Sequence, residues 1–335
     1  MTTLQSLKLA ILLILTTMSP VWGEDSRPVV IAHRGASGYL PEHTLEAKCL
    51  AYGFGADYLE QDVVLSRDDV PIVSHDIHLD RVTDIAARFP DRARADGRFY
   101  AIDFDWREIQ QLTVTERLGN SGKAAFPQRF PMMTGRFRIA SLAEELALIG
   151  ELNRQTGRHV GIYPELKQPA FHQREGKDIS RIVLGVLAEH GYVDASQPCF
   201  LQCFEWDELV RVKRELHCKL PLVYLVSRDR KWDALLQDER ALHQELTQIA
   251  DICTGLGPQL TMLLETRGSS SPQPTPLIKS AHAAGLKVHG WTLRAEELSS
   301  GAKDFKQLHT WIRDTGIDGC FSDFPDQTLG YWSGP

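Results

Sequence analysis

Short apolar runs alternate with longer amphipathic stretches along most of the chain after residue 27. The runs are rich in β-branched residues and apolar on both faces, which is typical of strands in a covered parallel sheet. The strand candidates are residues 29–33, 58–64, 71–75, 160–165, 199–204, 222–226, 251–255, 288–292 and 317–322. Because helical stretches separate most of them, the pattern predicts an α/β protein in which helices cover a parallel sheet.

Several of the intervening stretches carry helix boundary signals. Ser141 and Glu144 form a capping box, and Gly157 marks the end of the same helix. Apolar periodicity predicts further helices over residues 178–190, 205–216 and 275–284. Eight βα units would close a TIM (βα)8 barrel, so one strand candidate is in excess. A short turn joins the candidates at 58–65 and 71–75. We predict that the strand outside the barrel is either one of these two or the last apolar run.

The segment from residue 77 to residue 140 interrupts this rhythm. It is rich in Arg, Asp, Phe and Pro, lacks apolar runs of the same quality and has one short helical pattern near residues 106–112. A structureless loop of this length is uncommon in a compact domain. We therefore predict one barrel over residues 27–330, with a small inserted subdomain at about residues 77–140.

The first residues have the layout of an export signal. Lys8 precedes an apolar run of about ten residues, and Val21 and Gly23 occupy positions −3 and −1 of a cleavage site. The run is shorter than the ~20 residues that a membrane span requires. The sequence predicts a signal peptide over residues 1–23, cleavage near Gly23, no stable membrane insertion and a periplasmic or secreted protein.

Composition excludes several classes of protein. The chain has 335 residues, of which 43% are hydrophobic and 24% charged, values typical of a globular protein. A net charge of −7 argues against a nucleic-acid partner, which would require a basic surface. Export would permit disulfides among six cysteines, but most lie in apolar runs, so we expect fewer than half to be paired. Oligomeric state is not indicated.

Charged side chains end four consecutive strand candidates. In a βα barrel the carboxyl ends of the strands meet at one rim, where catalytic groups are found. The residues at these ends are His33, Arg34, Glu60, Asp62, His75, Glu165 and Lys167. Two histidines, three carboxylates and two cations would therefore lie close together.

The three carboxylates are candidate ligands for a metal ion. Glu60 and Asp62 project from the same face of one strand, roughly 6–7 Å apart, and would repel one another unless a cation lay between them. With Glu165 they make an oxygen-only site suited to Ca²⁺ or Mg²⁺. Two alternatives remain: a structural ion-pair network with Arg34 and Lys167, or a glycosidase acid/base pair.

His33 and His75 are candidates for a general acid and a general base, the alternative being a structural hydrogen-bonding role. The other histidines, His43 among them, are expected to be structural. Arg34 and Lys167 would hold an anionic phosphoryl group. No P-loop, G-x-G-x-x-G or G-x-S-x-G motif is present. Together these residues indicate metal-assisted cleavage of a phosphate ester.

The order of these motifs resembles that of the glycerophosphodiester phosphodiesterase family, in its bacterial periplasmic branch. The matching segments are IAHRG at 31–35, PEHT at 41–44, ADYLEQDV at 56–63, VSHD at 73–76, RVTD at 81–84, FPDRAR at 89–94, YPELK at 163–167, LQCF at 201–204, VHGWT at 288–292 and DGCFSDFPD at 318–326. The resemblance covers nearly all of residues 28–330.

The resemblance implies a barrel enzyme that hydrolyses small deacylated phospholipids, such as glycerophosphocholine and glycerophosphoethanolamine, to glycerol 3-phosphate and an alcohol. It implies a divalent cation, Ca²⁺ in this branch, held by Glu60, Asp62 and Glu165. The acid/base pair would be His33 and His75. The remaining implied residues are the phosphate-binding Arg34 and Lys167 and the pocket-lining Gln202, Phe204 and Trp291.

Two other functions remain open on the same scaffold. A phospholipase D-like enzyme acting on intact lipid would need an apolar or basic loop facing the membrane, whereas the 77–140 segment mixes Arg with many Asp. A non-enzymatic surface-binding protein would tolerate loss of the rim residues, yet all seven are present.

Overall fold

A closed barrel of eight parallel strands forms the centre of the computed structural model, which describes residues 27–265 and 272–333. The barrel strands are β1 (Val29–Ala32), β2 (Tyr58–Leu65), β4 (Gly161–Leu166), β5 (Leu201–Cys203), β6 (Leu222–Val226), β7 (Gly255–Pro258), β10 (Lys287–Leu293) and β11 (Gly319–Ser322). Their order follows the chain, and β1 pairs with both β11 and β2, which closes the sheet. The predicted TIM barrel is confirmed.

The excess strand candidate is β3 (Pro71–Val73), which pairs antiparallel with the end of β2 and lies outside the barrel. The turn after Leu65 sends the chain back toward the rim, and Ser74 N–H donates to the carbonyl of Asp62 at 2.9 Å. His75 therefore reaches the rim from a returning edge strand. Our expectation that four parallel strands deliver the site residues is corrected to three parallel strands and one antiparallel strand.

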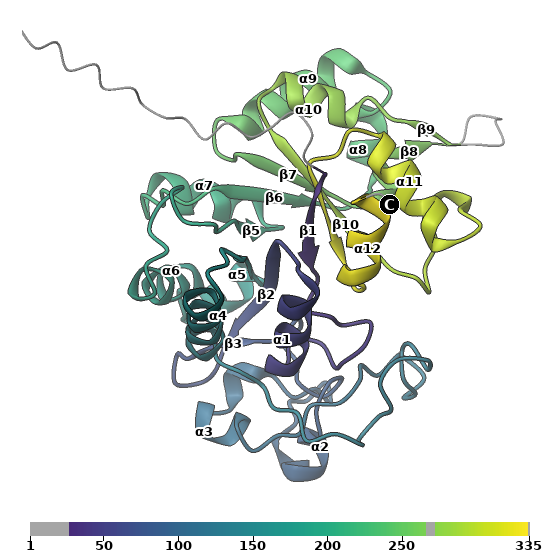
Figure 1. Ribbon diagram of the computed structural model, residues 1–335. Helices are drawn as coiled ribbons and strands as arrows, with labels where there is room; N and C mark the ends of the chain where they lie inside the picture. The colour runs from purple at the N-terminus through teal and green to yellow at the C-terminus, as the bar shows by residue number, and fades with distance from the viewer. Residues whose placement is uncertain (1–26, 266–271, 334–335) are drawn as a thin grey trace, which may run out of the picture.

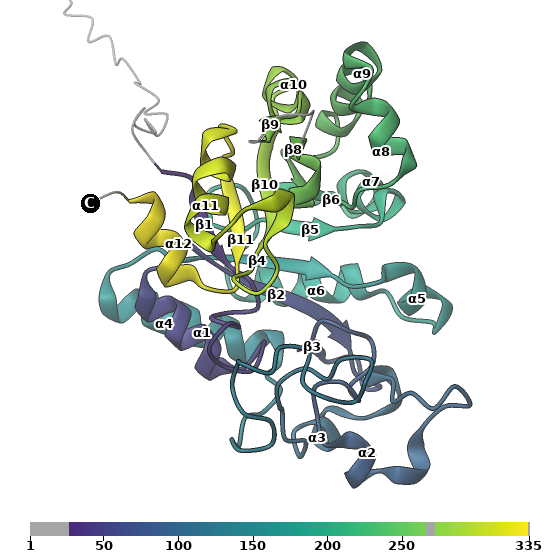
Figure 2. The same ribbon diagram turned by 90° about the vertical axis from the view of Figure 1, so that its right-hand side faces the viewer.

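Helices surround the barrel and connect its strands (Figures 1 and 2). They are α1 (Leu45–Phe54), α4 (Leu142–Thr156), α5 (Pro169–Arg174), α6 (Ile179–Glu189), α7 (Trp206–Arg214), α8 (Arg230–Leu235), α9 (Glu239–Ala250), α10 (Leu277–Ala283), α11 (Phe305–Asp314) and α12 (Pro325–Trp332). The capping box predicted at Ser141 and Glu144 begins α4, and Gly157 ends it in the left-handed conformation. The main hydrophobic core fills the space between these helices and the strands.

One strand was predicted at the wrong place. Residues 251–253 continue the turn that ends α9, since Cys253 N–H donates to the carbonyl of Ile249 at 2.8 Å. Strand β7 follows as Gly-Leu-Gly-Pro, a sequence with low strand propensity. Gly257 packs closely there, since a Cβ would lie 2.5 Å from the end of the Leu225 side chain, which would have to move. Inter-strand packing, rather than propensity, forms this strand.

Residues 77–140, which we name the β3–α4 segment, lie to one side of the barrel (Figure 2). They contain two short helices, α2 (Ile85–Arg88) and α3 (Trp106–Ile109), together with isolated bridges. A hydrophobic cluster that includes Leu79, Phe104 and Leu112 is centred in this segment. A two-stranded ribbon of β8 (Leu264–Glu265) and β9 (Gln273–Pro274) lies near α10.

The inside of the barrel is filled by aromatic rings. Tyr163 stacks on Phe200 with ring centroids 5.1 Å apart and meets Phe321 edge-on at 5.0 Å. Its hydroxyl hydrogen-bonds Nδ1 of His289 at 2.8 Å. This packing fills the barrel interior beneath the carboxyl end of the strands.

Two further predictions concern the chain as a whole. All six cysteines are free, in accord with the expectation that fewer than half would be paired. Within the described ranges, no helix is both long and apolar enough to cross a membrane. The predicted signal peptide, residues 1–23, lies outside the described residues.

Candidate active site

A cavity of about 420 Å³ opens at the carboxyl end of the barrel. All ten residues singled out from the sequence line it: His33, Arg34, Glu60, Asp62, His75, Glu165, Lys167, Gln202, Phe204 and Trp291. They come from β1, β2, β4, β5 and β10 or the residues just after them, and from the turn after β3. The barrel thus brings together side chains that are far apart in the sequence.

A tight turn after β1 sets the position of the first site residues. Arg34 and Gly35 both have positive φ, 58° and 84°. A Cβ on Gly35 would lie 2.8 Å from the backbone of Ala47 in α1, so only glycine fits there. The turn directs the Arg34 N–H at Oε2 of Glu60, 2.5 Å away.

The carboxylates form one layer across neighbouring strands. Asp62 is the register partner of Glu165, and Glu165 is the partner of Gln202. Burial, together with the charge of Asp62, raises the pKa of Glu60 well above its usual value. Burial likewise raises the pKa of Glu165 to about 8. These carboxyl groups resist ionisation because they lie out of water beside another anion.

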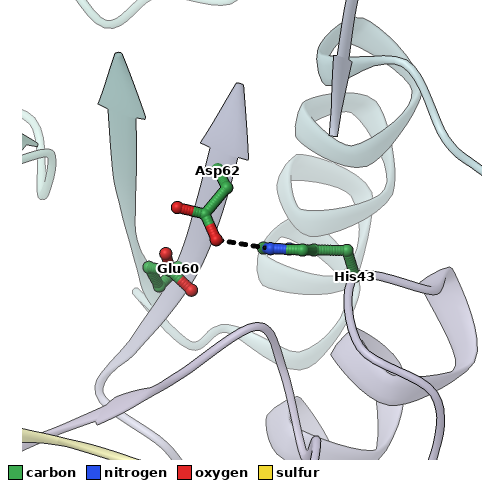
Figure 3. Close-up of side chains that lie close together, drawn as sticks. All are labelled: His43, Glu60 and Asp62. Atoms are coloured by element: carbon green, nitrogen blue, oxygen red, sulfur yellow. Dashed lines mark hydrogen bonds and ion pairs between the residues drawn. The ribbon is translucent and has the colours of Figure 1, made fainter. Parts of the chain in front are cut away.

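Asp62 stays ionised although it is buried. Burial opposes its charge, but Lys167, His75 and a hydrogen bond from His43 hold its pKa well below the usual range. His43 points from the loop before α1 toward Asp62, as Figure 3 shows, and its Nε2 donates to Oδ2 at 2.7 Å. We expected a structural role for His43; its place against Asp62 gives it a role in orienting this carboxylate.

The two cations lie beside the carboxylates. Lys167 Nζ is 2.6 Å from Glu165 Oε1 and 3.3 Å from Asp62 Oδ1. Arg34 Nη1 is 3.0 Å from Glu42, and its Nε is 3.5 Å from Asp62. Part of the alternative ion-pair network is therefore present, but Glu60 accepts a backbone N–H rather than a cationic side chain.

Each rim histidine is backed by a carboxylate. Nδ1 of His33 lies 2.5 Å from Asp323 Oδ1, and Nδ1 of His75 lies 2.6 Å from Asp76 Oδ1. An ionised carboxylate can only accept, so each Nδ1 carries the proton and each Nε2 has a free lone pair. Burial and nearby Arg34 lower the pKa of His33 to about 3 and that of His75 to about 4. Both imidazoles are neutral at pH 7.

Aromatic side chains form the opposite wall of the cavity. Phe204 meets Trp291 edge-on, with ring centroids 5.6 Å apart, and Lys167 Nζ lies 5.9 Å from the Phe204 ring. Trp291 is fixed by a bond from its indole N–H to the carbonyl of Gly257 at 2.8 Å. Gln202 is buried, and its Oε1 has no hydrogen-bond partner among the described residues.

Comparison with known proteins identifies this arrangement. Residues 33–327 match the sequence model of the glycerophosphoryl diester phosphodiesterase family. The glycerophosphodiester phosphodiesterase of Haemophilus influenzae is 39% identical over 92% of this chain and 91% of its own length. The chain belongs to the glycerophosphoryl diester phosphodiesterase family. It is accordingly a phosphoric diester hydrolase, and this excludes the alternative of a non-enzymatic surface-binding protein.

Solved structures agree with this assignment at the level of the fold. A Silicibacter pomeroyi DSS-3 protein assigned to the same enzyme class aligns with a TM-score of 0.69 at 24% identity, over 93% of this chain and 95% of its own. An Oleispira antarctica phosphodiesterase, solved in complex with the product sn-glycerol-3-phosphate, gives 0.62 at 24% identity, over 92% and 98%.

The residues of this family member fit a hard divalent cation. His43, Glu60 and Asp62 each offer a ligand atom within 4.8 Å of the others, and Glu165 adjoins Asp62 in the neighbouring strand. Burial and the nearby charge of Asp62 raise the pKa values of Glu60 and Glu165. A bound cation would stabilise the ionised form of both carboxyl groups. A metal site is therefore compatible with the donor chemistry present.

Sequence reasoning assigned no role to three residues that position the site. Asp323 follows β11 and holds His33, whereas Arg117 and Arg129 come from the β3–α4 segment. Arg117 reaches Asp76 at 2.6 Å and Glu42 at 2.6 Å, and Arg129 reaches Asp323 at 2.6 Å. The position of Asp323 directly after a predicted strand could have indicated a place at the rim. No pattern in the sequence indicates that the two arginines reach the site.

Proposed function

We propose that the chain hydrolyses glycerophosphodiesters, such as glycerophosphocholine and glycerophosphoethanolamine, to glycerol 3-phosphate and an alcohol. One observation carries the proposal: two carboxylate-backed imidazoles, two cations and three carboxylates line a single cavity. The product bound to the Oleispira antarctica protein, which has the same fold, is in keeping with this substrate class.

In this proposal Glu60, Asp62 and Glu165 hold a divalent cation, Ca²⁺ in preference to Mg²⁺. Carboxylates that can each bind through one or both oxygens suit the larger ion, whose coordination number is variable. When bound, the cation would supply positive charge beside the phosphoryl oxygens and lower the barrier to attack at phosphorus. His43 would keep Asp62 in place through its hydrogen bond.

Arg34 and Lys167 bind the phosphate group. Both side chains are largely buried and already lie among the carboxylates, so their charges are held at the rim before substrate arrives. This arrangement matters because the chain carries a net charge of −7, which repels an anionic diester. Affinity therefore comes from local charge. Gln202, Phe204 and Trp291 shape the cavity around the glycerol part.

His33 and His75 move the protons. One neutral imidazole accepts the proton of the glycerol 2-hydroxyl as that oxygen forms its bond to phosphorus. The bond from phosphorus to the alcohol oxygen breaks, and the second histidine, which takes up a proton from solvent when the anionic diester binds beside it, donates that proton to the alcohol oxygen. Water then opens the cyclic phosphate with the two roles exchanged. The carboxylate behind each ring stabilises its imidazolium.

The test measures glycerol 3-phosphate release from glycerophosphocholine before and after exhaustive chelation. We expect activity to be lost on chelation and to return with added Ca²⁺, and Mg²⁺ serves as the comparison. Activity that survives chelation would remove the metal assignment. An intact phospholipid is the control substrate, and its cleavage at a comparable rate would favour the phospholipase D-like alternative.

We also propose that residues 1–23 are removed during export and that the enzyme acts in the periplasm or outside the cell. The physical support is the short apolar run after Lys8 with small residues before the cleavage position. Sequencing the amino terminus of the protein recovered from its native compartment tests this, with Glu24 expected as the first residue.

A further inference from the structure

A second cavity, of about 650 Å³, adjoins the first and lies between the barrel rim and the β3–α4 segment. His33, Arg34 and His75 line both cavities. The second is completed by residues of the β3–α4 segment, including Glu116 and Phe126. A diester whose phosphorus lies beside the two histidines would therefore extend one half into each cavity.

The arginines of the second cavity are already paired. Arg117 binds Glu42 and Asp76, and Arg129 binds Asp323 and Glu296. Arg294 likewise binds Asp323 and Glu297. These ion pairs leave no arginine of the β3–α4 segment in this cavity without a carboxylate partner.

Glu116 differs from the other acidic residues of the cavity. Its side chain has no ion pair among the described residues, and its Oε2 is buried without a hydrogen-bond partner there. The residue is only 4% exposed. Burial raises the pKa of Glu116 to about 7, although the nearby Arg129 opposes this. A buried acceptor that lacks a donor is expensive to maintain and points to a ligand that supplies one.

The aromatic side chain of the cavity is not available to a quaternary ammonium group. The guanidinium carbon of Arg129 lies 4.0 Å from the centroid of the Phe126 ring, and that of Arg294 lies 5.9 Å from it. Recognition of a trimethylammonium group depends on open aromatic faces. A choline head group would therefore find the Phe126 ring covered by arginines. It also has no N–H group to donate to Glu116.

We propose that the second cavity receives the alcohol half of the diester and that Glu116 accepts a hydrogen bond from an N–H or O–H group of that alcohol. This inference rests on the function proposed above. The glycerol half is common to all substrates and suits the smaller cavity, whereas the alcohol varies in size and suits the larger one. Ethanolamine and polyol head groups carry the required donor, and choline does not.

A series of four substrates separates this donor from charge and from size. Glycerophosphoethanolamine and its N-methyl, N,N-dimethyl and N,N,N-trimethyl forms keep one positive charge, while the N–H groups fall from three to none. We expect kcat/KM to change little over the first two methylations and to fall by about tenfold or more at the last. A gradual decline with size, or no decline, would overturn the inference.

Substitution of Glu116 provides the second arm. Glu116→Met removes the acceptor at similar volume, and we expect the drop at the last methylation to shrink to within about threefold, whereas Glu116→Gln retains an acceptor and part of the drop. Glu151→Gln, on the exposed face of α4, is the control and should keep the full drop. A full drop in Glu116→Met would overturn the assignment of Glu116.

The outcomes also separate this inference from the proposed function. Glycerol 3-phosphate release by the wild type without a drop at the last methylation overturns the inference alone. No release from any of the four substrates overturns both. If Glu116→Met does not fold, as thermal unfolding would show, the wild-type series and Glu116→Gln still decide the matter.

Discussion

Asp323 and His33 are 290 residues apart in the sequence, yet Oδ1 of Asp323 lies 2.5 Å from Nδ1 of His33. The contact joins the residue after the last barrel strand to the residue after the first, across the β1–β11 pairing that closes the barrel. Arg129 and Arg294 hold the other oxygen of Asp323 at 2.6 and 3.0 Å. Closure of the fold therefore also orients an imidazole of the site.

Replacing Asp323 with Asn should lower kcat by about a hundredfold or more, with a smaller effect on KM. An Asn amide can donate to Nδ1, which would move the proton to Nε2 and leave that nitrogen unable to act as a base. The measurement is steady-state kinetics on glycerophosphoethanolamine. Asp326→Asn, three residues later and bound to the Tyr39 hydroxyl, is the control and should stay near wild type. Activity within about threefold of wild type in Asp323→Asn would contradict the role.

His33→Ala and His75→Ala should each lower kcat by about a hundredfold or more while the protein stays folded, because each removes one partner in proton transfer. Glycerol 3-phosphate release and thermal unfolding are measured on the same preparations. His282→Ala, which removes an imidazole bound to Asp318 away from the cavity, is the control. Near-normal rates in either rim variant would exclude its acid/base role.

Arg117→Met should reduce kcat by about tenfold without unfolding the barrel. Arg117 holds Asp76, which orients His75, and also Glu42, which orients Arg34. Loss of this side chain loosens both groups at once. Because this is a positioning role, Arg117→Lys, which can still bind one carboxylate, should restore part of the loss.

The matched control for Arg117 is Arg81→Met. Arg81 lies in the same segment and its side chain makes an exposed hydrogen bond to Asn120, so loss of this side chain should leave kcat unchanged. Equal loss in the two variants would mean that the segment merely unfolds. No loss in either would mean that Arg117 does not support the site.

Local signals in the sequence were sufficient to predict most strands and helices of the barrel. The capping box at Ser141 and the apolar runs of β1, β2, β4 and β6 correspond to observed elements because each depends on residues close together in the chain. They were insufficient for β7, whose glycines and proline form a strand only between β6 and β10. The direction of a strand could not be predicted from the sequence either. The apolar run of β3 resembles that of a barrel strand, and only its pairing with β2 shows that it is antiparallel.

The candidate site divides in the same way. Nine of the ten residues that the structure brings to the cavity lie in barrel strands or just after them, so barrel geometry places them at one rim, whereas His75 follows the antiparallel strand β3. Arg117 and Arg129 come from the β3–α4 segment, whose path over the rim is set by tertiary packing rather than by any local pattern. His43 could not be separated from structural histidines, because its contact with Asp62 depends on the turn that precedes α1.

Removing one member of the buried Lys48–Glu145 pair should be strongly destabilising. The side chains are 2.6 Å apart and fully buried, and Lys48 Nζ also donates to the carbonyl of Glu60. Lys48→Met leaves Glu145 charged and buried, which should lower the free energy of unfolding by about 3–5 kcal/mol. Urea unfolding measures this change.

The double variant Lys48→Met with Glu145→Leu should recover much of that loss, because no charge is then left unpaired. The exposed pair Arg154–Glu151 on the same helix is the control, and Arg154→Met should have no measurable effect. A double variant less stable than Lys48→Met alone would contradict this expectation, because Glu145, which also accepts a hydrogen bond from Gln61, would then stabilise the fold without its partner.

Protonation of His309 should contribute to loss of stability in acid. His309 lies away from the site, 1% exposed among aromatic rings, with Nδ1 donating to the carbonyl of Phe305 at 2.7 Å. Burial lowers its pKa from 6.5 to about 4. Because the folded pKa lies below the unfolded value, the unfolded state binds more protons in between, so stability falls as pH decreases from about 6.5 to about 4. At pH 4 the loss should approach about 3 kcal/mol.

His309→Phe removes this proton uptake, so its free energy of unfolding should fall less steeply between pH 6.5 and pH 4 than that of the wild type. Urea unfolding at several pH values in this range measures both slopes. Thr328→Val removes the hydroxyl that lies 2.8 Å from Nε2 but keeps the imidazole, and so should retain the wild-type slope. If His309→Phe and Thr328→Val lose stability with the same slope, the acid sensitivity arises at other groups, because only the first of them eliminates the titrating ring.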